Sequence, residues 1–142
     1  MGQSSNSAQI KKNIKKVLGK DKDILFAYLF GSQVTGLTHG FSDIDIACYL
    51  KPGSMKYYLE KDNQLLGDLA VGLHTSKFDL VLLNVCSLVL KFRVVSGGEV
   101  IFSRDEQARV DFETATLCRY FDFKPYLDEY YKLVHYKIKQ AV

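Results

Sequence analysis

The chain has 142 residues, of which 47% are hydrophobic and 25% are charged, and its formal net charge at pH 7 is +3. A domain of this length buries roughly 70% of the surface that its unfolded chain exposes, so we expect one domain over residues 1–142, with residues 1–6 disordered. The small positive charge argues against a direct nucleic-acid partner and is compatible with an anionic substrate.

Cysteine usage and the apolar runs bear on the cellular compartment. Cys48, Cys86 and Cys118 are far apart and odd in number, which predicts buried free thiols rather than a disulfide framework or a metal site. The polar N-terminus does not resemble a signal peptide, and the apolar runs are shorter than the roughly 20 residues that a membrane span needs. We therefore expect a cytoplasmic protein without membrane association.

Hydrophobic periodicity and turn signals predict helices that alternate with strands. In chain order, we expect a helix at 7–19, a strand at 24–30, a turn at Gly31 into a short helix, a strand at 42–49, a helix at 54–73, a strand at 78–83, a helix at 87–95, an edge strand at 99–102, a helix at 103–119 and a C-terminal helix at 122–142. Ser103 and Glu106 fit a capping box, and Asp122 is expected to cap the last helix, with Pro125 in its first turn. This order predicts an α/β (α+β) fold in which a small mixed sheet is flanked by helices and followed by a helical C-terminal part.

Two aspartates on the expected second strand suggest chemistry. Asp43 and Asp45 point to the same face because side chains alternate along a strand, while Ile44, Ile46 and Cys48 point to the other face. Carboxylates about 6.6 Å apart repel each other by about 2–3 kcal/mol at an effective dielectric constant near 20. A divalent cation turns that repulsion into attraction, and oxygen ligands of this kind suit Mg²⁺.

A third acid and a glycine–serine pair complete the candidate site. Asp79 begins the third expected strand, so it can lie beside Asp43 and Asp45 if the strands are neighbours. Three acids on adjacent strands match the needs of two-metal phosphoryl transfer. Gly31 permits close backbone approach, Ser32 offers a hydroxyl donor, and a following helix N-terminus would favour phosphate.

These residues resemble the signature of the DNA polymerase β-like nucleotidyltransferases, and most closely the minimal nucleotidyltransferases (MNT), the antitoxin partners of HEPN-domain toxins. The resemblance extends from Tyr28 to about Asp122 and implies transfer of AMP from ATP, with two Mg²⁺ ions, to a tyrosine of a HEPN RNase toxin. It implies that the catalytic residues and metal ligands are Asp43, Asp45 and Asp79, and that the triphosphate is held by Gly31 and Ser32. Many relatives carry arginine where this chain has Gln33, which removes one guanidinium near the phosphates.

Two other functions remain open from the sequence. The chain could neutralise a toxin by masking it without catalysis, or transfer a nucleotide to a small molecule or RNA. His39, Lys77 and Arg104 are each either solvated side chains or contacts to the nucleotide.

The last helix bears on the oligomeric state. Its apolar stripe has the spacing of a core-facing helix. Its additional tyrosines indicate either partial burial or a surface for a partner, in a homodimer or a hetero-oligomer.

Overall fold

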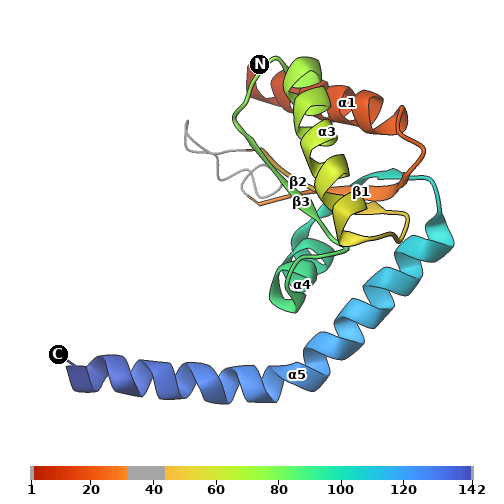
Figure 1. Cartoon of the computed structure of the whole chain (residues 1–142). Helices are drawn as coiled ribbons and strands as arrows, with labels where there is room; N and C mark the ends of the chain where they lie inside the picture. The colour runs from red at the N-terminus through yellow and green to blue at the C-terminus, as the bar shows by residue number, and fades with distance from the viewer. Residues whose placement is uncertain (1, 32–43, 142) are drawn as a thin grey trace.

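The computed structural model describes residues 2–31 and 44–141. Its elements in chain order are α1 (Gly2–Gly19), β1 (Ile24–Phe30), β2 (Ile44–Leu50), α3 (Met55–Leu73), β3 (Phe78–Leu82), α4 (Leu88–Gly97), β4 (Glu99–Ser103) and α5 (Glu106–Ala141). Figure 1 shows helices on both sides of a central sheet, with α5 extending away from the rest of the chain.

The four strands form one mixed sheet in the order β3-β2-β1-β4. β1 is antiparallel to both β2 and β4, whereas β2 and β3 are parallel. The crossover between β2 and β3 is made by α3, as a parallel connection requires. The fold class predicted from the sequence is therefore confirmed, and β4 is the predicted edge strand.

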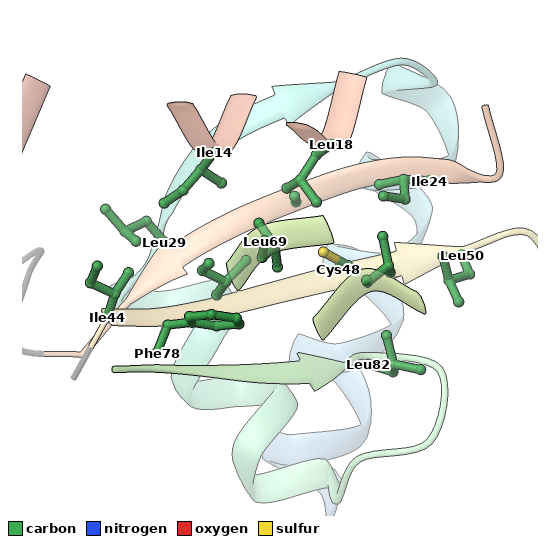
Figure 2. Close-up of a cluster of buried hydrophobic side chains, with 13 residues drawn as sticks. Ile14, Leu18, Ile24, Leu29, Ile44, Cys48, Leu50, Leu69, Phe78 and Leu82 are labelled. Carbon is green, nitrogen blue, oxygen red and sulfur yellow. The ribbon is translucent and has the colours of Figure 1, made fainter. Parts of the chain in front are cut away.

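The two faces of the sheet carry separate apolar clusters. Helices α1 and α3 cover the first face, where Ile14 and Leu69 pack on Ile46, and Figure 2 shows this cluster between the helices and the strands. Helices α4 and α5 cover the second face, where Val94 and Phe112 pack against Tyr28 and Ala47. Odd-numbered residues of β2 from Asp45 onward belong to the second face, as the strand alternation predicted.

The N-terminal helix begins earlier than expected. The sequence predicted disorder over residues 1–6, but the backbone of α1 is helical from Gly2. Ile14 and Leu18 are fully buried and fix the C-terminal half of this helix on the sheet. Once that half is held, each preceding residue can add one hydrogen bond at the modest cost of helix propagation, and no proline interrupts it.

The predicted break between two C-terminal helices is wrong, because α5 is continuous and contains Pro125 in its interior. Tyr120 stacks on Phe92 of α4 with ring centroids 3.6 Å apart, which packs α5 on α4 just before the expected break at Asp122. Figure 1 shows a bend part-way along α5, as expected for an internal proline such as Pro125.

The start of α5 also differs from the prediction. The Asp105 side chain caps the helix by accepting a hydrogen bond from the Ala108 backbone N–H at 3.0 Å. Ser103, which the capping-box pattern suggested as the cap, is the last residue of β4.

The cysteine prediction holds in part. Cys48 is buried and Cys86 is half-buried, but Cys118 is exposed on α5. Burial raises the pKa of the Cys48 thiol to about 12, so this thiol is protonated at neutral pH. Among the helices that the structure describes, none is both long and apolar enough to cross a membrane.

Candidate active site

Asp45 and Asp79 lie side by side at one end of the sheet. β2 and β3 are parallel, and their register pairs Asp45 with Asp79 directly across the strands. Neighbouring strands are about 4.8 Å apart, and residues at the same register position point to the same face. The expectation that the third acid lies next to the second strand is confirmed, and we call these two residues the acid pair.

The acid pair is on the sheet face that α4 and α5 cover. Asp45 pairs with Phe30 across the antiparallel ladder, and Phe30 belongs to the cluster with Val94 and Leu83. Asp45 is half-buried and Asp79, on the edge strand, is exposed. The pair therefore lies where the core ends and solvent begins, which leaves it open to a substrate.

Gly31 follows β1 directly, at a position that only glycine fits. Its φ is +81°, in the region that favours glycine. A Cβ atom at this position would also overlap the carboxylate of Asp45. The backbone of Gly31 thus lies against one member of the acid pair, as a phosphate cradle beside metal-binding carboxylates would need.

Gly98, which follows α4 directly, is a second glycine near the site. A Cβ atom there would overlap the Val94 carbonyl oxygen and lie 3.4 Å from the Phe30 Cβ atom. Its N–H donates to that carbonyl at 2.8 Å. Gly98 therefore lets α4 end directly against the last residues of β1.

The other predicted residues fall in different places. Asp43 and Ser32 lie outside the described residues, as do Gln33 and His39. Among residues 2–31 and 44–141, no group of three acidic, histidine or cysteine side chains could hold a metal ion. The described part of the predicted triad is therefore the acid pair, whose oxygen atoms are the donor type that suits Mg²⁺.

Arg104 is a structural residue rather than a phosphate contact or a solvated charge. Its guanidinium donates to the backbone carbonyl oxygens of Gly19 and Ile24 at 3.0 and 3.3 Å and lies 5.2 Å from the centre of the Phe102 ring. Arg104 thus lies at the start of β1, where Ile24 is. Gly31 follows the other end of that strand, about 20 Å away. Lys77 is exposed, and its carbonyl oxygen accepts a hydrogen bond from Ile44 N–H at 3.3 Å.

A cavity of about 480 Å³ between α4 and α5 is lined in part by Tyr49, Asn84 and Phe112. It lies near the Leu50 end of β2, where the Asn84 side chain accepts from the Leu50 N–H at 2.8 Å and donates to its carbonyl at 2.9 Å. The acid pair is at the opposite ends of β2 and β3, so this cavity belongs to another part of the molecule.

Comparison with known proteins agrees with this geometry. The family model described as polymerase beta, nucleotidyltransferase matches residues 12–107, which contain the acid pair and the whole sheet. The chain belongs to this nucleotidyltransferase family. No curated protein matches the sequence of this nucleotidyltransferase.

Solved structures of toxin–antitoxin complexes resemble the nucleotidyltransferase over nearly its full length. A crystal structure of a toxin–antitoxin with AMP-PNP contains a chain 28% identical, with a TM-score of 0.74, and the match covers 88% of this chain and 98% of that one. A tri-AMPylated HEPN toxin of Shewanella oneidensis in complex with its MNT antitoxin contains a chain 25% identical, with a TM-score of 0.64, over 94% and 98% of the two chains. A chain of the MntA–HepT toxin–antitoxin is 25% identical, with a TM-score of 0.68, over 89% and 97%.

Proposed function

We propose that this nucleotidyltransferase is an MNT antitoxin that transfers AMP from ATP to a tyrosine hydroxyl of a HEPN-domain toxin. The observation that carries the proposal is the register pairing of Asp45 with Asp79 on parallel strands, beside the backbone of Gly31. The relatives support the nucleotide and the acceptor, since one was crystallised with AMP-PNP and another with a tri-AMPylated HEPN toxin.

The acid pair fits a divalent cation. Two carboxylates about 5 Å apart on neighbouring strands repel each other by about 3 kcal/mol at an effective dielectric constant near 20. We propose that Asp43, Asp45 and Asp79 together hold two Mg²⁺ ions. When bound, the cations neutralise the triphosphate and lower the pKa of the acceptor hydroxyl.

The residues of the chain then have separate roles in the transfer. Gly31 and Ser32 hold the triphosphate, and Asp45 would hold a cation that neutralises the phosphate charge next to them. The tyrosine oxygen forms a bond to the α-phosphorus as the bond from that phosphorus to the β-phosphate oxygen breaks, and pyrophosphate leaves. Asp79, exposed on the edge strand, is the carboxylate open to the acceptor, and it accepts the hydroxyl proton.

The test is the intact mass of a purified HEPN-domain toxin after incubation with this chain, ATP and Mg²⁺. We expect the wild-type chain to add at least one AMP and the Asp45→Asn variant to add none in the same time. Equal modification by the two proteins would contradict the assignment of Asp45. An unmodified toxin with the wild-type chain would contradict AMP transfer itself.

A second candidate is an antitoxin that masks the toxin by binding alone, and the exposed C-terminal half of α5 favours it. Under this alternative an Asp43→Ala, Asp45→Ala double variant would neutralise the toxin as well as wild type does. Under AMP transfer, the same variant would bind the toxin and leave its RNase activity intact.

A further inference from the structure

The C-terminal half of α5, residues 122–141, lies beyond the packed body of the protein, and we call it the arm. Phe92 of α4 contacts both Tyr120 and Phe121 of α5, with ring centroids 3.6 and 5.9 Å apart. Beyond these contacts, large apolar side chains of the arm are exposed to solvent. They are Phe123, Tyr126, Tyr130, Tyr131, Leu133, Tyr136 and Ile138. The sequence predicted a core-facing stripe here, and that prediction is wrong because Phe123, Tyr130 and Ile138 of the stripe are exposed, with no core against them among the described residues.

Most of these side chains share one side of the helix. At 100° per residue, Phe123, Tyr130 and Ile138 fall within a central stripe, and Leu127 and Val134 complete it. Tyr126 and Leu133 flank the stripe on one side and Tyr131 on the other, so the apolar face spans about 160° of the helix. Tyr136 lies outside this face.

The arm needs a covering partner. A helix of about 20 residues without tertiary contacts is marginally stable in water. A contiguous apolar face of this kind marks a site of protein association, and tyrosine is enriched at such interfaces. The arm is therefore an interaction surface.

The width of the apolar face indicates the shape of the partner. In a two-stranded coiled coil, the positions beside the stripe carry charges that select the partner helix. Here those positions hold Tyr126, Leu133 and Tyr131, so a second copy of the arm would leave apolar flanks in water. A face of about 160° is instead covered by two helices with a groove between them.

We propose that the arm docks in an apolar groove between two helices of the HEPN toxin, and the identity of this partner rests on the proposed function. The match to the antitoxin complex with the tri-AMPylated toxin covers 94% of this chain, which leaves about nine of its 142 residues unmatched. Most of the arm therefore has a counterpart in a protein seen with a HEPN toxin. In Figure 1 the arm also extends toward the side on which β1 ends and β2 begins, where the acid pair lies.

The test compares two variants of one helix. A Tyr126→Glu, Tyr130→Glu double variant changes side chains that are 69% and 61% exposed on the apolar face. Tyr136→Glu changes a side chain that is 63% exposed on the other side and is the matched control. Affinity for the HEPN toxin used in the AMP-transfer test is measured by titration calorimetry, and circular dichroism checks that the variants remain folded.

We expect the double variant to bind the toxin at least 100-fold more weakly, the control to stay within threefold of wild type, and Asp45→Asn to bind normally. The docking proposal would be overturned if wild type, the double variant and the Tyr136→Glu control bound the toxin with equal affinity. It would also be overturned if the control lost as much affinity as the double variant, and either result would leave AMP transfer intact. Normal docking without AMP transfer by wild type would overturn only the proposed chemistry. A wild-type homodimer that the double variant abolishes, with no binding to the toxin, would assign the arm to a second copy instead.

Discussion

The two ends of the sheet arrange their charges in opposite ways. At the start of β1, Lys61 of α3 lies 2.8 Å from the Asp21 carboxylate and 3.0 Å from that of Asp23. At the other end, the register places the carboxylate of Asp45 beside that of Asp79. One end brings a cation between two acids from the same chain, and the other brings two acids together at the surface.

This difference separates a structural network from a functional site. Asp21 and Lys61 are both largely buried, and their pairing fixes α3 against the turn that precedes β1. Like charges directly opposite each other on neighbouring strands destabilise a sheet. A sequence selected only for folding gains nothing from such a pair, and under the proposed function a bound cation offsets the repulsion.

The largest effect is expected for Asp45→Asn. If Asp45 holds a catalytic cation, the rate of AMP transfer should fall by at least about 1,000-fold, which corresponds to about 4 kcal/mol of transition-state stabilisation. The melting temperature should stay within about 2 °C of wild type. Single-turnover transfer to the toxin measures the rate, and Asp68→Asn on the exposed side of α3 is the control. Full activity of the Asp45 variant would show that the acid pair is not catalytic.

The next effect is expected at the opposite end of the sheet. Lys61→Met leaves two carboxylates facing each other without their cation, and should lower the free energy of unfolding by about 2–3 kcal/mol. Lys56→Met, exposed on the same helix, should change it by less than about 0.5 kcal/mol. Urea denaturation measures both. A loss at Lys61 no larger than at Lys56 would mean that this network does not hold α3.

Gly31→Ala should destabilise the protein by about 1–2 kcal/mol and also lower activity, because φ is positive there and a Cβ atom would overlap Asp45. Gly67→Ala is the opposite case, since its Cβ atom would meet nothing within 4 Å. That change within α3 should stabilise the protein by up to about 1 kcal/mol. Thermal denaturation compares the two variants, and equal shifts would argue against the close approach of Gly31 to Asp45.

The smallest expected effect is the pH dependence of the stability that the Lys61 network contributes. The hydrogen bond from Lys61 holds the pKa of Asp23 below its ordinary value. Burial acts to lower the pKa of Lys61, but the hydrogen bonds to Asp21 and Asp23 outweigh it and raise that pKa. The Asp23 contribution is therefore present above its unfolded pKa of about 3.9 and is lost as the pH falls through its lower folded pKa.

The contribution of Lys61 to the free energy of unfolding depends on pH in the opposite direction to that of Asp23. It is fully present below the unfolded pKa of about 10.4 and is lost as the pH rises through the higher folded pKa of Lys61. The stability difference between wild type and Lys61→Met should be constant from about pH 5 to pH 9 and shrink outside that window. Denaturation at a series of pH values checks this, and a difference that does not change at either extreme would contradict it.

The sequence predicted the sheet well because its strands are strongly patterned. The run Ile24–Phe30 is apolar throughout, and the alternation after Asp43 assigned Ile46 and Ala47 to opposite faces. The pairing of Asp45 with Asp79 required one more fact, that β2 and β3 are neighbours. The two strands are parallel neighbours joined by the α3 crossover. From the sequence, the position of Asp79 beside Asp45 could be predicted only if these strands were neighbours.

The C-terminal region could not be predicted because its outcome depends on contacts distant in the sequence. Pro125 and Asp122 carry the local signals of a helix start, yet α5, which packs on α4 through the stacking of Tyr120 on Phe92, continues through both. The spacing of Phe123 and Tyr130 predicts an apolar face correctly, but periodicity does not say whether the same chain covers it.

The central claim is that the acid pair is held together by a bound divalent cation, and thermal denaturation of Asp79→Asn with and without Mg²⁺ tests it most directly. Without Mg²⁺, the variant should melt at the same temperature as wild type or higher, because one of two repelling charges has been removed. With Mg²⁺, wild type should gain stability through binding, and the variant should gain much less. A variant that melts lower than wild type without Mg²⁺, and that gains as much from Mg²⁺, would contradict the claim.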